Sequence, residues 1–401
     1  MTNPRIAPSL DTLAVRGGEP RSHSYDAVTV PIVCSATYAF DSSQHIRDYF
    51  EGRIEREEYG RYGNPTVRAV EHKLASLDGA DAAVLFPSGM NAITTLLLAM
   101  LKPGDHIVMM SDCYRRTRQF LQTTLAKFGV RHTLLDPDAL DTLPALIEPG
   151  HTRLILTEAP TNPYLRVPDV SRLVAVARAH RGIKVLVDTT LASPAVFRPL
   201  EHGADLVLHS CTKYLGGHND LLAGVVCGSS ALIDALREAR GVFGGMPDPH
   251  GAYLLMRGCK TLAVRMRQHN DSALAVARFL ERHPGIERVY YPGLESHPDH
   301  AAARAQFTGG YGGMISFRVR GDHEHAARFI DHTRLPTVAA SMGGVESLID
   351  QPALMSFYEL TSEQRQQIGI FDNLIRLSVG LEGCADLIAD LDRALRAVTE
   401  G

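Results

Sequence analysis

The alternation of short apolar runs with segments of helical periodicity constrains this chain most. The runs are four or five residues long and lie at 106–110, 131–135, 153–157, 184–187 and 205–208. Strands interleaved with helices form a largely parallel sheet, and ligands of such sheets bind beyond the carboxyl ends of the strands. We therefore expect an α/β fold with its site at those strand ends.

The regular part of the chain begins near residue 65. Pro65 suits the first position of a helix, apolar residues then recur on one face, and Gly79 ends the helix. Before it, residues 1–60 read as an irregular arm with turn-forming residues, and such an arm often packs on a neighbouring subunit. The expected large domain spans 61–257.

A second α/β pattern follows a long helical stretch at about 248–283. Its apolar runs lie at 289–291, 313–319, 335–339 and 374–379. A chain of 401 residues is long enough for two or three domains. We expect a smaller C-terminal α/β domain over 258–401.

Composition excludes several classes of function. The formal net charge is −4, with no block of like charges, which argues against a nucleic-acid partner. The longest strongly apolar stretch, 92–101, is far shorter than the roughly 20 residues of a membrane span. Residues 1–10 lack the apolar centre of a secretory signal, and the six cysteines form no CxxC pair. These features predict a cytoplasmic protein with reduced thiols.

Motifs for nucleotide hydrolysis, metalloprotease and serine hydrolase chemistry are absent. The sequence has no GxxxxGK, HExxH or GxSxG segment. His209, Cys211 and His218 lie close together, but their spacing matches no zinc pattern. Polar packing explains them better, and we expect no metal.

Lys213 stands out because lysine is scarce in this sequence. It lies in the segment HSCTKYLGGH (209–218), directly after a predicted strand and among hydroxyl groups and glycines. A surface lysine has no need of such surroundings. A lysine nucleophile beside hydroxyls that can bind phosphate is what a Schiff base with pyridoxal 5′-phosphate requires.

Other predicted strand ends offer what that cofactor needs. Asp188 could pair with the pyridine nitrogen, although an aspartate there could also cap a helix. Ser88, Gly89 and Met90 open a predicted helix at 91–101, whose free N–H groups and dipole attract a phosphate.

Tyr114 follows the predicted strand at 106–110 and could stack on the cofactor ring. The alternative is an ordinary interface tyrosine.

Five segments in this order resemble the cysteine and methionine metabolism family of pyridoxal-phosphate enzymes, which includes cystathionine γ-synthases, cystathionine lyases, methionine γ-lyases and homoserine-ester sulfhydrylases. The segments are YGRYGNPT (59–66), EAPTNP (158–163), the Lys213 segment, SMGGVESL (341–348) and NLIRLS (373–378). The resemblance implies fold type I, like aspartate aminotransferase, with a mainly parallel seven-stranded sheet in the large domain.

The resemblance also implies roles for individual residues. Lys213 would form the Schiff base, Asp188 would pair with the pyridinium, and Tyr114 would stack on the ring and carry protons. Asn162 would lie near the pyridoxal hydroxyl. The phosphate would be held by Gly89, Met90, Ser210 and Thr212 of one subunit and by Tyr59 and Arg61 of its neighbour.

Arg376, helped by Ser341, would bind the α-carboxylate of an amino-acid substrate. The shared site requires a dimer, and two dimers would form a homotetramer.

Within the family the sequence is most similar to plant-type cystathionine γ-synthases. This implies γ-replacement on an O-activated L-homoserine with L-cysteine, giving L-cystathionine. The alternatives are a γ-lyase acting on a homoserine-type amino acid such as cystathionine or methionine, and a replacement with another nucleophile in specialised metabolism. The chain departs from the family at Thr189 and Leu191, and at Ala340, where several members carry an acidic residue that receives the second substrate.

A non-catalytic binding protein on the same scaffold is a third reading. It would have lost a chemical residue, and Lys213, Asp188, Tyr114 and Arg376 are all present.

Arg115 and Arg116 follow Tyr114 and could attract the phosphate or succinate of an anionic leaving group. A solvated helix face explains their spacing equally well.

Overall fold

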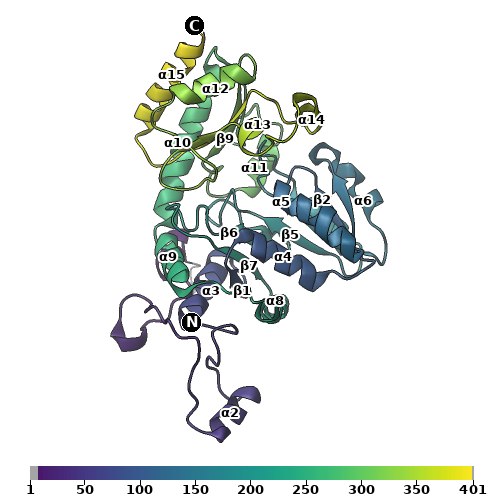
Figure 1. The fold of residues 1–401 in the computed structure, drawn as a ribbon, viewed down its shortest axis with the longest axis vertical. Helices are drawn as coiled ribbons and strands as arrows, with labels where there is room; N and C mark the ends of the chain where they lie inside the picture. The colour runs from purple at the N-terminus through teal and green to yellow at the C-terminus, as the bar shows by residue number, and fades with distance from the viewer. Residues whose placement is uncertain (1–7, 400–401) are drawn as a thin grey trace, which may run out of the picture.

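The computed structural model describes residues 8–399, and it contains two sheets (Figure 1). The first seven residues of the predicted arm, and most of the stretch used to judge a secretory signal, lie outside the described residues. The larger sheet has seven strands in the order β1-β7-β6-β5-β4-β2-β3. Its strands are β1 (Ala82–Phe86), β2 (His106–Met110), β3 (Arg131–Leu135), β4 (Thr152–Glu158), β5 (Lys184–Asp188), β6 (Leu206–Ser210) and β7 (Gly224–Gly228).

The larger sheet is mainly parallel, as predicted. Only β7 runs against its neighbours, β1 on one side and β6 on the other. Five of the seven strands coincide with predicted runs, while β1 and β7 were not predicted. Gly224, at the start of β7, lies so close to the chain before α4 that a Cβ there would come 2.4 Å from the Ser88 carbonyl oxygen.

Helices cover both faces of the larger sheet. The predicted helix from Pro65 is present as α3, where the Asn64 side chain accepts the N–H groups of the first turn and Gly79 ends the helix with φ 68°. The helices α3 (Pro65–Asp78) and α4 (Gly89–Met100) pack on β7, α3 with β1 and α4 with β6. The other helices of this part are α5 (Arg115–Gln119), α6 (Leu143–Leu146), α7 (Val170–Arg178), α8 (Ser230–Phe243) and α9 (Pro249–Cys259).

Single turns of other helix types complete this part of the chain. A π-helical turn, Phe120–Thr124, continues α5, and 3-10 turns span Leu125–Phe128, Pro137–Thr142 and Pro199–His202.

The smaller sheet has five strands in the order β10-β11-β12-β9-β8. It is antiparallel except between β10 and β11. The strands are β8 (Ile286–Tyr290), β9 (Met314–Val319), β10 (Thr337–Val338), β11 (Leu348–Asp350) and β12 (Leu374–Ser378). The three-residue strand β11 was not predicted.

Helices α10 and α12 pack on the smaller sheet, and α15 packs on those two helices. The predicted helical stretch at 248–283 is in fact two helices, because the chain leaves helical geometry at Thr261 between α9 and α10. The helices of this part are α10 (Leu262–Arg282), α11 (His300–Gln306), α12 (His323–His332), α13 (Pro352–Met355), α14 (Ser362–Gln367) and α15 (Cys384–Thr399). Within residues 8–399, no helix is both long and apolar enough to cross a bilayer.

The predicted arm is less irregular than its composition indicated. It contains α1 (Leu10–Arg16), a 3-10 turn (Ser24–Asp26) and α2 (Ser43–Phe50). Helix α1 packs on α3 and α10 of its own chain, and the buried ion pair between Lys73 and Glu19, 2.8 Å apart, holds the chain that follows it. The segment that carries α2 extends away from the body of the molecule (Figure 1).

Candidate active site

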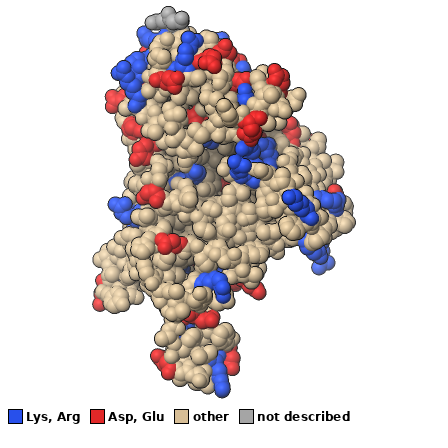
Figure 2. Space-filling view, in the orientation of Figure 1, with Lys and Arg blue, Asp and Glu red and all other residues tan. Residues whose placement is uncertain are grey.

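A cavity of about 930 Å³ opens at the carboxyl ends of the parallel strands, and segments of the smaller sheet form its other wall. Figure 2 shows the hollow between the two parts of the molecule, with basic side chains gathered at its rim. Thirteen of the predicted site residues line it: Ser88, Gly89, Met90, Tyr114, Arg115, Arg116, Asn162, Asp188, Ser210, Thr212, Lys213, Ser341 and Arg376. The packing of the two parts of the molecule thus brings together residues that are up to 288 positions apart.

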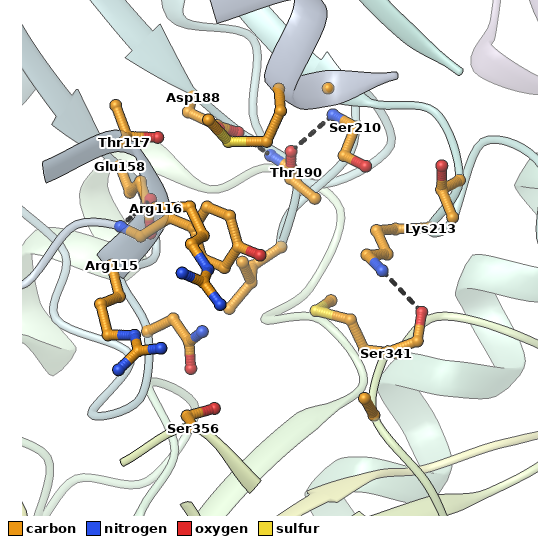
Figure 3. A pocket seen from close by; sticks show the side chains of 18 of the residues that line it. Arg115, Arg116, Thr117, Glu158, Asp188, Thr190, Ser210, Lys213, Ser341 and Ser356 are labelled. Atoms are coloured by element: carbon orange, nitrogen blue, oxygen red, sulfur yellow. Dashed lines mark hydrogen bonds between the residues drawn. The ribbon is translucent and has the colours of Figure 1, made fainter. Parts of the chain in front are cut away.

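Lys213 points into the cavity (Figure 3), where its Nζ donates a hydrogen bond of 2.6 Å to Ser341 Oγ. Burial, together with the positive charge of Arg376, lowers the pKa of Lys213 to about 8. Ser341 has φ 96°, a backbone conformation that a residue with a side chain adopts only under strain. The hydroxyl of this strained residue thus lies against the Lys213 amine.

Asp188 ends β5 and lines the cavity, and no helix begins after it, so the helix-cap alternative was wrong. Its Oδ1 accepts a hydrogen bond of 2.9 Å from the Thr190 backbone N–H. Thr190 in turn accepts a hydrogen bond from the Ser210 backbone N–H at 2.8 Å through its hydroxyl oxygen. This chain of contacts ties the ends of β5 and β6 together.

The start of α4 lies against the end of β6. Ser88 caps α4 by accepting the Asn91 N–H at 3.0 Å, so the helix begins two residues earlier than predicted. A Cβ added at Gly89 would come 2.9 Å from Ser210 Cβ, which leaves room only for glycine. Helix N-termini carry free N–H groups and a positive dipole end, so this narrow cradle suits an anion such as a phosphate.

Tyr114 precedes α5 and lies half-exposed on the cavity wall. Its backbone N–H donates a short hydrogen bond to Glu158 Oε1. Placement in the cavity favours the predicted role over an ordinary interface tyrosine.

Glu158 lines the cavity, although the sequence analysis used it only as a letter of a motif. It ends β4 and is the direct partner of Asp188 in the register of the two strands. Burial and the neighbouring Asp188 raise the pKa of Glu158 well above its ordinary value. The signal that could have found it was available, because it ends its strand as Asp188 ends the next one. Burial also raises the pKa of nearby Asp112 to about 6.

Arg376 enters from β12 of the smaller sheet. Its Nη2 and Nε donate to Asp350 Oδ2 at 2.6 and 3.2 Å, and its Nη1 donates to Asn162 Oδ1 at 3.2 Å. Asp350 is almost wholly buried, so the guanidinium is fixed in position with N–H groups left to face a ligand.

Arg115 and Arg116 lie on the cavity wall opposite Lys213 (Figure 3). Arg115 forms an ion pair with Glu359 and lies over the Phe357 ring, 5.5 Å from its centroid. Arg116 donates to Gln119 at 2.8 Å. Both residues belong to α5 and also line the cavity, so their binding of an anionic leaving group stays a prediction.

Tyr59 and Arg61 do not line the cavity of their own chain. Tyr59 is 39% exposed, and the Arg61 guanidinium donates to the Tyr62 hydroxyl at 3.0 Å.

His209 pairs with Asp78 at 3.0 Å. Over residues 8–399, no cluster of histidine, cysteine and acidic side chains could hold a metal ion.

The sequence and the structure are similar to those of known proteins. Residues 11–396 match the family described as Cys/Met metabolism PLP-dependent enzyme. The chain is 45% identical over 389 residues to cystathionine gamma-synthase 1, chloroplastic, of Arabidopsis thaliana, covering 96% of this chain and 69% of the relative. It is 41% identical to the L-methionine gamma-lyase of Pseudomonas putida, covering 97% and 98%. A crystal structure of metB from Corynebacterium glutamicum superposes with a TM-score of 0.90 at 38% identity over 98% of both chains.

Proposed function

The chain belongs to the Cys/Met metabolism family of PLP-dependent enzymes, and from this membership and the cavity we propose that it replaces the γ substituent of an O-activated L-homoserine with L-cysteine, giving L-cystathionine. The observation that carries the proposal is the convergence of Lys213, Asp188, Tyr114 and Arg376 on one cavity. Similarity to cystathionine γ-synthases of plants and bacteria supports it.

The residues of the cavity fit pyridoxal 5′-phosphate. The close approach of Gly89 to Ser210 leaves a cradle for a phosphate, which Ser88, Met90 and Thr212 would complete. Asp188 would pair with the ring nitrogen, Asn162 would lie near the ring hydroxyl, and Tyr114 would stack on the ring. When bound, the cofactor supplies an electron-withdrawing ring that stabilises negative charge on the substrate carbons.

Lys213 would move the protons of the reaction. Its lowered pKa makes the neutral amine accessible near neutral pH, so Nζ can accept a proton from the α carbon of the substrate. The Ser341 hydroxyl, 2.6 Å away, holds Nζ in the cavity. Tyr114 lies on the same cavity and would assist the transfer to and from the neighbouring carbons.

Arg376 would bind the α-carboxylate of the substrate as a two-pronged donor. Asp350 and Asn162 already fix its guanidinium, so little ordering is needed when the substrate binds.

Arg115 and Arg116 would bind an anionic γ substituent, because they add positive charge to the wall facing Lys213. This favours phospho- or succinyl-homoserine over the acetyl ester.

A γ-lyase is the second candidate, favoured by Ala340. This residue lines the cavity beside Ser341 with a methyl group, so it offers no charge to the ammonium group of a cysteine nucleophile. The similarity to L-methionine γ-lyases of 39–41% identity points the same way. Elimination would follow if water reaches the activated substrate before a thiolate does.

Mass-spectrometric product analysis separates the two reactions. The enzyme with pyridoxal phosphate receives phospho-, succinyl- or acetyl-homoserine, each with and without cysteine, and Lys213→Ala serves as the inactive control. Cystathionine formed only with cysteine would establish the replacement and identify the ester. Formation of 2-oxobutyrate regardless of cysteine would overturn it in favour of the lyase.

We also propose a homotetramer, built as a dimer of dimers, in which Tyr59 and Arg61 reach the cavity of the neighbouring chain. Large apolar side chains of the arm support this, since Tyr25, Val28 and Phe50 are exposed. The six cysteines, all unpaired, favour a reducing compartment such as the cytoplasm.

A further inference from the structure

Two acidic residues end neighbouring strands on the cavity wall. Glu158 of β4 and Asp188 of β5 are register partners, and neighbouring strands lie about 4.8 Å apart. Glu158 is only 4% exposed, while Asp188 opens onto the cavity. The burial of Glu158 and the repulsion between two like charges on adjacent strand ends favour a pair that retains one proton at neutral pH.

Hydrogen bonds indicate which residue keeps it. Burial raises the pKa of Asp188 above its ordinary value, but hydrogen bonds from both the backbone and the side chain of Thr190 favour its charged form. Glu158 accepts a bond only at Oε1, from the Tyr114 N–H, and its Oε2 is buried without a partner in the described structure. An orphaned, buried oxygen fits the O–H of a neutral carboxyl group better than a carboxylate.

A buried ion pair behind the sheet supports the same assignment. Leu208 and Ser210 line the cavity, so His209 between them faces the opposite side, where Asp78 lies 3.0 Å from its Nε2. Burial acts to lower the pKa of His209, but the Asp78 carboxylate raises it overall. The His209 ring contacts Thr189, the residue after Asp188, and the charge of the protonated ring favours an ionised Asp188.

Other titratable groups face these residues and do not change which carboxyl group keeps the proton. Asp112 and Arg118 face Glu158 with opposite charges. Cys211 and Cys227 face Asp78, and burial raises the pKa of both thiols, so they stay neutral.

We propose that Glu158 and Asp188 share one proton, held on Glu158, and that Asp78 and His209 fix it there. Glu158 is then a neutral positioning residue, whose Oε1 accepts the Tyr114 backbone N–H. The charge of Asp188 stays available for a cationic ring nitrogen. The proposal rests on the cofactor site but not on whether the enzyme replaces or eliminates a substituent.

Infrared spectroscopy of the holoenzyme in D₂O tests where the proton lies. At pH 8 Asp112, with a pKa of about 6, is ionised and adds no protonated-carboxyl band, so substitutions assign the band to its residue. We expect Glu158→Gln to remove that band. A band that survives in Glu158→Gln and disappears in Asp188→Asn would overturn the assignment, and so would no band in the wild-type enzyme.

The pH dependence of the visible absorbance of the bound cofactor tests the role of His209. We expect His209→Gln, and likewise Asp78→Asn, to move its midpoint by about one pH unit or more, whereas Glu158→Gln leaves it unchanged. His106→Gln is the matched control, because His106 is also buried in this sheet but its side chain bonds to Thr133 and Thr152 and pairs with Glu148. An unmoved midpoint in both His209→Gln and Asp78→Asn, or an equal shift in His106→Gln, would contradict the proposal. Because neither readout measures turnover, a failed γ-replacement assay leaves both tests intact.

Discussion

Lys213 gives the cavity a pH dependence that can be measured before any turnover. Only the neutral amine attacks the cofactor aldehyde, and burial lowers the pKa of Lys213 to about 8. The rate at which cofactor-free enzyme binds pyridoxal phosphate covalently should therefore rise about tenfold per pH unit below pH 8 and level off above it. Stopped-flow absorbance measures this rate.

The position of that inflection also tests the effect of Arg376. Arg376→Gln removes a positive charge beside Lys213, so the inflection should move to higher pH. An inflection near the ordinary lysine value in the wild-type enzyme would show that the amine is not buried as described.

The preference of the enzyme among the three esters tests the proposed role of Arg115 and Arg116. If they bind the γ substituent, replacing both by alanine should raise KM for phospho- and succinyl-homoserine by about tenfold and leave KM for the acetyl ester nearly unchanged. Steady-state kinetics with the three esters measures this. Glu359→Gln is the control, since it breaks the ion pair with Arg115 while the arginine stays charged. An equal rise in KM for all three esters would contradict this role.

Among the elements, the start of α4 carries the clearest prediction. Alanine is a good helix former, so Gly89→Ala should leave α4 stable, but its Cβ would press on Ser210 and narrow the cradle. We expect the dissociation constant for pyridoxal phosphate, measured by fluorescence titration, to rise tenfold or more. Gly251→Ala, in the first turn of α9 with open space around it, should leave the constant unchanged. Unaltered binding by Gly89→Ala would mean that the phosphate lies elsewhere.

The elements that could be predicted are those with a local signal. Strands β2 and β3 have the predicted bounds, because each is an apolar run between turns or helices. Strand β7 was not predicted because it begins and ends with glycine, which usually weakens a strand. Gly224 allows the close approach of β7 to Ser88.

Residues of the cavity, too, could be predicted only where the sequence carries a local signal. Lys213 and Asp188 could be found because each follows a recognisable strand. The contact of Arg115 with Glu359 could not, since it joins residues 244 positions apart and leaves no periodic trace in the sequence. The partnership of Arg376 with Asp350 depends on β11, a strand too short to predict.

At the scale of the whole molecule, we predict from the arm that two chains share each active site. If Arg61 serves the neighbouring chain, Arg61→Ala and Lys213→Ala should each be nearly inactive alone. Co-expressed in equal amounts, they should recover about a quarter of the wild-type activity, because half of the dimers are hybrids and one of their two sites is intact. Arg53→Ala is the control, since Arg53 pairs with Asp48 of its own chain at 2.7 Å. No recovery in the mixture would indicate sites built within single chains.

The two walls of the cavity come from different parts of the chain. The wall with Lys213 and Asp188 belongs to the larger sheet, while Ala340, Ser341 and Phe357 come from a short stretch of the C-terminal part. Substitutions at Ala340 and Phe357 can therefore change which amino acid the cavity accepts without altering Lys213 or Asp188.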